Sequence, residues 1–404
     1  MVHIPVVLAT DNNYIPLIVV LTSLAENAGN DTFYDIYILT DDSFTQTSKG
    51  CVSRCLKSYE NHCSITFKNV GTIFDNALLS ISHITRPTYF RLVIPDLLKE
   101  EKCIYLDTDT IVASDLKELF NISLNNNYVA GVWHPGVVLF EWENVIPRNA
   151  NIPSAEQYIN AGVLLMNLKQ LCKDGMVKKF LELIPRNMPS QDQDIINSAC
   201  YGKITFIPFK YNVITKIADR CIEDYQGSYP EAELIEAWNN PCIIHYADRT
   251  KPWNSGDCVF MDYWWKYFKK SSIYESVVND FFNEFVTNII YCSQRTMMFT
   301  KKMPQIFDIT FKRNYVVYGA GEKAREVLSF LKQFDIVPEF IVVSDSRENP
   351  SKIEGIDVKN IEDAGQMLCD KTILIAVSEK LHKEIINRIQ EYDYIELLPV
   401  SDNF

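Results

Sequence analysis

Two aspartates separated by one residue, Asp107 and Asp109, stand in the middle of an apolar stretch. The residues from Cys103 to Val112 are mostly apolar β-formers, and they predict one buried strand. Because side chains alternate along a strand, both carboxylates would project to the same side. There they would repel each other unless a cation lay between them. Oxygen ligands suit Mg²⁺, Mn²⁺ or Ca²⁺, so the stretch indicates a metal site.

The alternative is a strand that ends in a solvated loop, with Asp109 capping the next helix. A second stretch, Pro241–Tyr246, predicts an apolar strand that carries His245 at its end, and Lys251 follows six residues later. A histidine at a strand end is usually structural, and a lysine in a loop is usually solvated. Beside an acidic metal pair, however, imidazole and ammonium would form a clamp for a diphosphate.

The elements that would position these groups begin with a short apolar strand at Val6–Ala9, then a polar turn, then a helix. This order opens an α/β nucleotide-binding fold, whose ligands lie at the carboxyl ends of strands. There Asp11 and Asn13 could bond a base edge while Tyr14 packs on the ring. The alternative, which we favour from these residues alone, is that Asp11 or Asn13 only caps the helix.

Other segments could bind a substrate. Arg91 interrupts an aromatic and apolar stretch, and a buried arginine needs an anionic partner; a surface ion pair is the alternative. Residues 135–156 have little periodicity, which predicts a long loop that could act as a binding lid. Gln191–Asn197 predicts a helix with acids and amides at its start, where the helix dipole alone would explain the acids. Further strands are predicted at 33–39, 64–67, 128–134 and 158–168.

Composition limits the class of protein. A length of 404 residues suggests two or three domains, and 47% hydrophobic residues fit a globular protein with real cores. A net charge of −13 argues against a broad nucleic-acid surface. Eleven cysteines without a Cys-x-x-Cys pair predict reduced thiols. With no basic N-terminal region and no apolar run of about 20 residues, we expect a cytoplasmic protein without a signal peptide.

The last third of the chain changes character. Aromatic residues at 263–268 predict a helix that packs on the preceding domain, and Ser272–Ile290 predicts an amphipathic helix. Residues 295–303 mix apolar and basic side chains, which favours a solvated linker, with peripheral membrane contact as the alternative. A homodimer is a further option that the sequence leaves open.

Asn314–Phe404 predicts a separate α/β unit. A strand leads into Gly319 and Gly321 and then a helix, which is the G-x-G-x-x-A dinucleotide pattern, and Asp345 stands near the ribose-binding distance. At about 90 residues the unit is half of a complete dinucleotide fold. We favour a docking or dimerisation role, with binding of a nucleotide or sugar nucleotide as the alternative.

Six motifs stand in one order along the chain: Ala9-Thr10-Asp11-Asn12-Asn13-Tyr14, Leu106-Asp107-Thr108-Asp109, Asn160-Ala161-Gly162, Asp192-Gln193-Asp194, His245-Tyr246 and Lys251-Pro252-Trp253. In this order they resemble glycosyltransferase family 8 over roughly residues 3–255. That family comprises retaining sugar transferases and includes lipopolysaccharide galactosyltransferases and glycogenin. The resemblance also extends to the cytosolic enzymes that glycosylate serine-rich adhesins.

The resemblance implies a UDP-sugar donor and a Mn²⁺ ion, with Mg²⁺ as the alternative, and an imidazole ligand favours Mn²⁺. It implies that Asp107, Asp109 and His245 hold the metal. The implied nucleotide site comprises Ala9, Thr10, Asp11, Asn13, Tyr14, Asp107, Thr108, His245 and Lys251. The implied donor-sugar contacts are His83, Arg91, Asn160, Ala161, Asp192 and Gln193.

The resemblance also frames the mechanism, with Gln193, Asp192 and Lys251 as the catalytic residues. Gln193 matches the position on the face where a double displacement needs a nucleophile, and an amide is a poor one. We therefore expect a front-face reaction in which a phosphate oxygen of UDP accepts the proton of the acceptor hydroxyl. A covalent adduct on Asp192 or Asp194 is the alternative.

The predicted fold is α/β: a GT-A nucleotide-diphospho-sugar transferase domain at 1–257, a helical connector at 258–313 and a small Rossmann-like domain at 314–404. The predicted function is Mn²⁺-dependent retaining transfer of a hexose, galactose or else glucose, from UDP to a glycan or glycosylated protein. A non-catalytic subunit of a glycosylation complex and an NAD-binding oxidoreductase are the alternatives.

Overall fold

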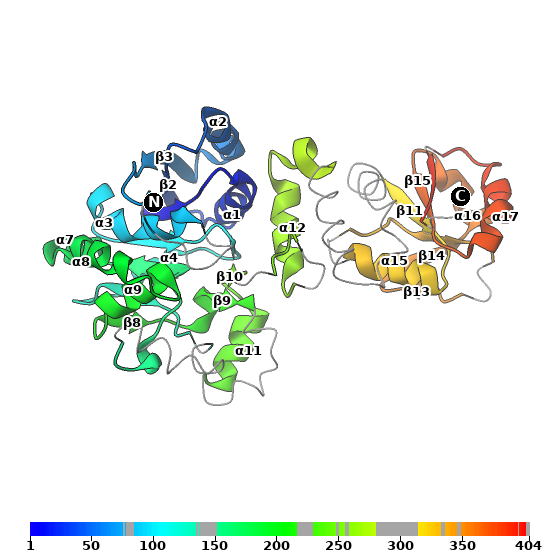
Figure 1. The fold of residues 1–404 in the computed structure, drawn as a ribbon. Coiled ribbons are helices and arrows are strands. Elements are labelled where there is room, and N and C mark those ends of the chain that lie inside the picture. Colours follow the sequence, from blue (N-terminus) through cyan, green and yellow to red (C-terminus); the bar gives the residue numbers. More distant parts are fainter. Residues whose placement is uncertain are drawn as a thin grey trace. The chain divides into compact units, whose positions relative to one another are not determined.

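The structure is a computed structural model. It describes residues 1–75, 77, 85–134, 136, 152–215, 229–247, 250–254, 258–279, 314–332, 336–345, 349–394 and 396–400. Contacts divide the chain into two units, which are described separately (Figure 1). The first comprises Met1–Arg249 with Tyr267–Ile273, and the second comprises Thr250–Lys266 with Tyr274–Phe404. The predicted boundaries at residues 257 and 313 stay predictions.

The first unit is built on a seven-stranded sheet with the order β3-β2-β1-β4-β7-β6-β8. The neighbours from β3 to β4 are parallel, whereas β7 runs antiparallel to both β4 and β6. The strands are β1 (Val2–Ala9), β2 (Thr32–Thr40), β3 (Cys63–Asn69), β4 (Cys103–Leu106), β6 (Val129–Gly131), β7 (Val163–Met166) and β8 (Ile204–Phe206). The predicted strands at 6–9, 33–39, 64–67, 128–134 and 158–168 are therefore confirmed, with shifted ends.

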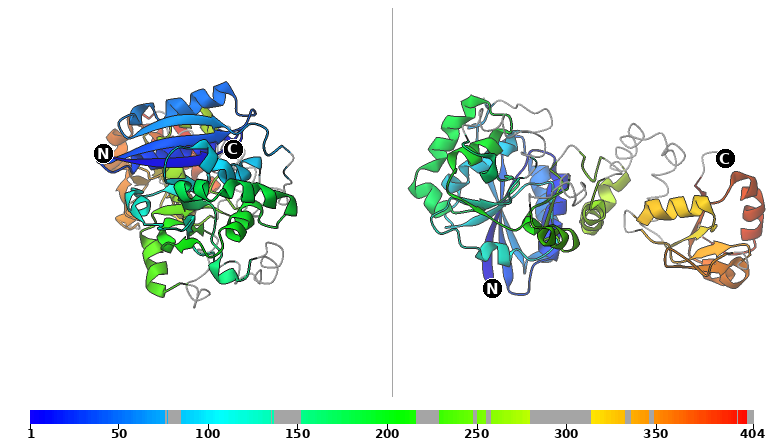
Figure 2. Two further views of the ribbon diagram at one scale, coloured as in Figure 1. Left: turned by 90° about the vertical axis from the view of Figure 1, so that its left-hand side faces the viewer. Right: turned by 90° about the horizontal axis from the view of Figure 1, so that it is seen from below.

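Helices cover both faces of this sheet. Figure 2 shows the blue helices α1 and α2 on one side of the strands and the green helices on the other. The sequence of α1 is apolar almost all round, and its residues from Pro16 to Ala25 are buried. The helices are α1 (Tyr14–Glu26), α2 (Gln46–Cys55), α3 (Ile94–Leu97), α4 (Lys117–Asn121), α7 (Leu168–Lys173), α8 (Met176–Leu183), α9 (Gln191–Ala199) and α11 (Glu231–Asn239).

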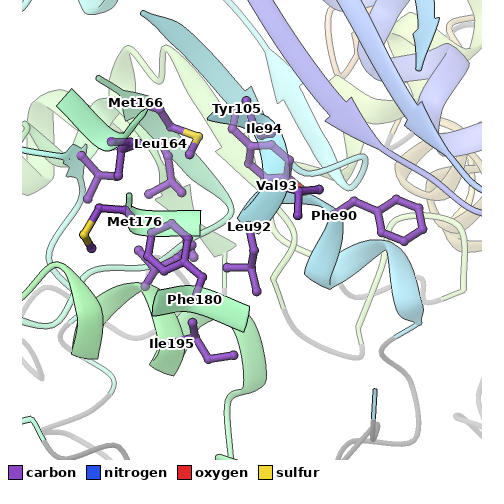
Figure 3. Close-up of a cluster of buried hydrophobic side chains, with 14 of the residues drawn as sticks. Phe90, Leu92, Val93, Ile94, Tyr105, Leu164, Met166, Met176, Phe180 and Ile195 are labelled. Carbon is purple, nitrogen blue, oxygen red and sulfur yellow. The ribbon is translucent and has the colours of Figure 1, made fainter. Parts of the chain in front are cut away.

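One apolar core connects the sheet to the segment that carries Arg91. Figure 3 shows buried apolar side chains of this core, with Leu92 and Ile94 among residues from β4, β7, α8 and α9. The short 3-10 helices are η1 (Lys57–Tyr59), η2 (Arg86–Val93), η4 (Ala155–Gln157), η5 (Ile184–Arg186) and η6 (Phe209–Tyr211). Burial of these apolar residues on both sides of η2 fixes the backbone around Arg91, which is itself buried.

The predicted single strand from Cys103 to Val112 is wrong. The chain forms β4, turns at Asp107–Asp109, and then forms β5 (Thr110–Val112) in a different sheet. The hydroxyl of Thr110 donates a hydrogen bond to the carbonyl oxygen of Asp107 at 2.7 Å and closes this turn. Two carboxylates in succession are better solvated in a turn than inside a buried strand.

The second sheet of this unit contains β5, β10 (Ile243–His245) and β9 (Val213–Ile214), in the order β5-β10-β9. β10 pairs antiparallel with β5, so that His245 lies opposite Thr110. The predicted strand at 241–246 is confirmed, and its pairing brings the histidine beside the aspartate turn.

The second unit contains a sheet with the order β13-β14-β12-β11-β15-β16, in which β11, β12, β14, β15 and β16 are parallel. This confirms the predicted Rossmann-like α/β fold. Its elements are β11 (Tyr315–Tyr318), α15 (Glu322–Lys332), β12 (Ile341–Val343), β13 (Lys352–Ile353), β14 (Ile356–Asn360), α16 (Ile361–Ala364), η9 (Gly365–Leu368), β15 (Thr372–Ile375), α17 (Glu379–Ile389) and β16 (Glu396–Pro399).

The predicted helix over the aromatic run at 263–268 is confirmed as α12 (Met261–Lys270). The helix predicted at 272–290 is described only as far as residue 279, and the basic segment at 295–303 lies outside the described residues. No helix within the described parts of the chain has the length and apolar character needed to cross a bilayer.

Candidate active site

Three side chains converge at the turn between β4 and β5. One carboxylate oxygen each from Asp107 and Asp109 and one ring nitrogen of His245 all lie within 4.8 Å of one another. The Nε2 atom of His245 is 3.4 Å from Asp109 Oδ1 and 3.8 Å from Asp107 Oδ2. Two carboxylates and an imidazole are a donor set that Mn²⁺ accepts readily, and these spacings leave room for one ion between them.

The absence of a side chain at Gly162 leaves room for this cluster. A Cβ atom at this position would lie 2.1 Å from Cε1 of His245 and 2.8 Å from Oδ2 of Asp107. Any side chain larger than a hydrogen would therefore displace two of the three candidate ligands. The residues present thus fit a metal ion, and the glycine of the Asn160-Ala161-Gly162 motif is part of that fit.

Arg91 bonds Asp107 of this turn and is 4% exposed. Its Nη2 donates to Asp107 Oδ1 at 2.6 Å, and its Nε lies 3.0 Å from Asp192 Oδ2. Burial lowers the pKa of this guanidinium, but the two carboxylates outweigh burial and the net shift is upward. The expectation that a buried arginine has an anionic partner is confirmed, and Arg91 holds both carboxylates in place.

Asp192 starts the helix α9 and is 4% exposed. Burial raises its pKa to about 6, and the nearby charge of Asp107 adds to the rise, although Arg91 and a hydrogen bond from Thr88 oppose it. Both oxygens of this carboxylate have partners, because Thr88 donates to Oδ1 and Arg91 lies against Oδ2.

Gln193 is held by its amide oxygen. Oε1 accepts from the backbone N–H of Ala161 at 3.0 Å and from Nδ2 of Asn160 at 3.1 Å. Nε2 donates to the hydroxyl of Tyr158 at 3.1 Å, and that hydroxyl donates to Asp194 at 2.5 Å. Four predicted residues, Asn160, Ala161, Asp192 and Gln193, are therefore brought to the same sheet edge as the metal cluster.

The turn after β1 lies at this edge too. β1 and β4 are parallel with Leu8 opposite Leu106, so Ala9 and Thr10 lie next to Asp107. Asp11 Oδ1 accepts from the backbone N–H of Asn13 at 2.9 Å. The side chain of Asn13 makes no capping hydrogen bond to α1, so the favoured capping role is wrong for this residue.

Some predicted site residues cannot be placed against this cluster. His83 and most of the proposed lid at 135–156 lie outside the described residues. Lys251 belongs to the second unit, where its backbone N–H donates to Asn254 Oδ1 at 2.7 Å. The predicted roles of His83 and Lys251 stay predictions.

Sequence reasoning missed four residues that contact the predicted ones: Thr88, Tyr105, Tyr158 and Asn212. Tyr105 donates to Asp107 Oδ1 at 2.8 Å, and its ring lies 4.3 Å from the guanidinium carbon of Arg91. Alternation could have found Tyr105, because it lies two residues before Asp107 in the same stretch. Asn212 has no local signal, since one amide before a short strand is common.

The glycine turn of the second unit has a different surrounding. Gly319 has φ of +122°, and a Cβ there would lie 2.7 Å from the carbonyl oxygen of Ala376 and from Cγ1 of Val377. A Cβ on Gly321 would meet nothing within 4 Å. Close backbone packing therefore explains the first glycine without a ligand.

Comparison with known proteins agrees with this geometry. The sequence profile of Glycosyl transferase family 8 matches residues 5–257, which is more than half of the chain. The chain belongs to this family. A lipopolysaccharide 1,2-glucosyltransferase of Escherichia coli (strain K12) is 26% identical over 257 residues, 60% of this chain and 71% of that protein. A lipopolysaccharide 1,3-galactosyltransferase of Salmonella typhimurium is 27% identical over 187 residues, 44% of this chain and 52% of that protein.

Among solved structures, the family 8 chain resembles the galactosyltransferase LgtC in complex with donor and acceptor sugar analogues. The TM-score is 0.58 at 23% identity, and the match covers 67% of this chain and 96% of LgtC. The predicted GT-A fold is confirmed. Family membership makes the chain a glycosyltransferase, and the cluster of Asp107, Asp109 and His245 is where the divalent metal common in GT-A enzymes would bind.

Proposed function

We propose that the chain transfers a hexose, galactose or else glucose, from a UDP-sugar to a glycan or glycosylated protein, with retention at the anomeric carbon. The observation that carries this proposal is the convergence of Asp107, Asp109 and His245 at the edge where β1 and β4 both end. The names of the two lipopolysaccharide transferases, one a glucosyl and one a galactosyl enzyme, support a hexose donor.

The nucleotide would lie along the turn after β1. Asp11, Asn13 and Tyr14 are at least partly exposed there, and their polar groups suit a base and a ribose. Because Ala9 and Thr10 neighbour Asp107 in the sheet, uridine bound at this turn would direct its diphosphate toward the metal cluster. Thr108 lies within the same turn as both aspartates, and Lys251 is proposed from the family resemblance as a second diphosphate contact.

Asp107, Asp109 and His245 would hold Mn²⁺, with Mg²⁺ as the alternative. When bound, the ion neutralises charge on the diphosphate as UDP departs. The protein would hold these three ligands close together before the nucleotide binds. Arg91 supports the site, because its guanidinium donates to Oδ1 of Asp107 and holds that carboxylate in place.

The residues beside the predicted sugar position favour a front-face reaction. The Oε1 atom of Gln193 is occupied by donors from Ala161 and Asn160, so its amide can offer a substrate only an N–H group. This amide would hold the sugar through a hydroxyl and would not attack it. A phosphate oxygen of UDP then remains the group that accepts the proton of the acceptor hydroxyl.

The partners of the two neighbouring carboxylates argue against a covalent adduct. Asp192 has partners on both oxygens, and Asp194 is fully buried against Tyr158 and the backbone N–H of Ser190. A nucleophile must lie about 3 Å from the anomeric carbon, so either carboxylate would first have to leave these bonds. Trapping an adduct with a slow donor, followed by mass spectrometry, tests this point: a modified aspartate contradicts the front-face reaction.

The experiment for the function is release of free UDP from a panel of UDP-sugars, with Mn²⁺ and with chelator. We expect slow hydrolysis of one donor, abolished by chelator and reduced by about 10³-fold in Asp109→Asn, since several kcal/mol of charge stabilisation are lost. Asp174→Asn is the matched control, because Asp174 bonds Tyr128 and Gln170 away from the cluster and should keep full activity.

Two other outcomes would change the proposal. A scaffold role predicts that Asp109→Asn keeps its biological function with the fold intact. Binding of no UDP and hydrolysis of no donor would contradict the transferase and favour either a non-catalytic subunit or a role centred on Gly319 and Gly321 in the second unit.

A further inference from the structure

Asn212 is a buried residue that contacts a proposed metal ligand without being one. It lies between η6 and β9 and is 0% exposed. Its Oδ1 lies 3.0 Å from Nδ1 of His245, and its Nδ2 donates to Oδ1 of Asn160 at 2.8 Å. One side-chain amide therefore connects the metal cluster to the residues proposed to hold the sugar.

The orientation of the connected amides is determined by backbone groups. The N–H of Gly162 donates to Oδ1 of Asn160 at 2.9 Å, and the N–H of Ala161 donates to Oε1 of Gln193 at 3.0 Å. A backbone N–H can only donate, so the atom that it faces in each amide must be the oxygen. These two contacts leave Nδ2 of Asn160 to donate to Gln193.

The same reasoning extends to the histidine. Because Oδ1 of Asn160 is an acceptor, the group of Asn212 that faces it must be the NH₂. The remaining atom of that amide, Oδ1, then faces Nδ1 of His245 and can only accept. The proton of the neutral imidazole must therefore be on Nδ1, and Nε2 carries the lone pair.

We propose that Asn212 is a positioning residue that fixes His245 in the Nδ1–H tautomer and thereby presents the Nε2 lone pair to the metal. Nε2 is the ring atom that faces Asp107 and Asp109, at 3.8 and 3.4 Å. Metal-binding histidines generally donate their other N–H to an oxygen, and loss of that partner weakens metal binding by about 10- to 100-fold. The metal part of this inference rests on the proposed function, whereas the tautomer does not.

The direction of these hydrogen bonds has a second consequence. Starting at His245, each residue donates a hydrogen bond to the next, in the order Asn212, Asn160, Gln193 and Tyr158. Each of the three amides therefore has only one possible orientation of its oxygen and its NH₂ group. A change of His245 tautomer would require every amide to reverse, against the two fixed backbone N–H groups. The metal ligand and the proposed sugar residues are thus held by one set of hydrogen bonds.

The test uses the full chain labelled with ¹⁵N-histidine, without metal, at about pH 8, above the ordinary pKa of imidazole. Nitrogen–proton correlation spectra report which ring nitrogen carries the proton, and His245→Gln assigns the signal. We expect Nδ1–H in the wild type. In Asn212→Ala we expect a mixed or Nε2–H signal, together with Mn²⁺ affinity reduced by about 10- to 100-fold, measured by electron paramagnetic resonance.

Asn197→Ala is the matched control, because Asn197 is also a buried amide but bonds the backbone of Ile159 and Gln193. It should keep the wild-type tautomer and Mn²⁺ affinity. Asn212→Leu keeps a side chain of similar size but removes the acceptor for Nδ1–H, so it should change the tautomer in the same way and keeps the inference testable if Asn212→Ala fails to fold.

An Nε2–H signal in the wild type, or an unchanged tautomer and Mn²⁺ affinity in Asn212→Ala, would overturn the inference and leave the proposed transferase standing. An Nδ1–H signal with no Mn²⁺ binding in the wild type would confirm the tautomer and contradict the metal site of the proposed function.

Discussion

Each unit contains a buried cation, and the two cations have different surroundings. The side chain of Arg91 is 5% exposed, and its partners Asp107 and Asp192 are 25% and 6% exposed. The side chain of Lys371 is 10% exposed, but its partners Glu339 and Asp370 are 50% and 66% exposed. Buried ion pairs add little net stability, so the network around Arg91 is better explained by the carboxylates that it positions.

The glycines at the strand ends differ in the same way. A Cβ on Gly162 would strike the side chains of His245 and Asp107, which are polar groups of the site. A Cβ on Gly319 would strike the carbonyl of Ala376 and a valine side chain, which are packing atoms. The comparison shows that the atoms for which a glycine makes room distinguish a functional site from simple packing, although both glycines lie directly beside a strand.

The largest effect that we expect is from the buried arginine. Arg91→Met leaves Asp107 and Asp192 without their cation and should lower the free energy of unfolding by about 3–5 kcal/mol, as breaking a buried ion pair does. Lys371→Met removes a cation whose partners remain solvated, and should cost at most about 1 kcal/mol. Urea unfolding of both variants measures the difference, and equal losses would break the comparison.

The next effect is a pH dependence from Asp192. Its pKa in the folded chain is about 6, raised mainly by burial from an ordinary 3.8. A raised carboxyl pKa means that the folded state binds the proton more tightly than the unfolded state. The contribution of Asp192 to the free energy of unfolding is therefore fully present below pH 3.8. It is lost as pH rises through 6, by about 3 kcal/mol in total.

The measurement is urea unfolding of the wild type and Asp192→Asn, without metal, between pH 4 and 7. The free energy of unfolding of the wild type minus that of the variant should fall as pH rises, because asparagine does not ionise. The contributions of the other titrating groups are the same in both proteins and cancel in this difference. A constant difference would show that the positive charge of Arg91 balances burial at this carboxylate, and a difference that rises with pH would show that it outweighs burial.

The smallest effects that we expect come from replacing each of the two glycines by alanine, which tests the comparison between the two units directly. Gly162→Ala should weaken Mn²⁺ binding by about 10- to 100-fold, because His245 must move away. Gly319→Ala should leave Mn²⁺ binding and UDP release unchanged, while strain at φ +122° costs about 1–3 kcal/mol locally.

Hydrogen exchange in the full chain measures that local cost at the amides of β11 and β15. Faster exchange there in Gly319→Ala, with an unchanged first unit, is the expected result. A loss of UDP release in Gly319→Ala would assign the glycine turn after β11 a part in the reaction, which the packing of Gly319 does not suggest.

Most of the elements and the family could be predicted from the order of residue types along the chain. Continuous apolar runs predicted the parallel strands, because a strand covered on both faces has no polar side. The glycine turn before α15 was predicted from residue types and its strand–turn–helix context. Six short motifs in one order predicted the transferase, and the match to residues 5–257 confirms the family.

The assembly of the site depends on strand pairings between segments that lie far apart along the chain. Local periodicity predicted one strand through Asp107 and Asp109, whereas the chain turns there and enters another sheet. The antiparallel pairing of β10 with β5 places His245 opposite Thr110, beside the aspartates. Asn212 reaches His245 through the parallel neighbour β9. Pairings between segments distant along the chain leave no trace in a local window, because each is set by the packing of whole sheets.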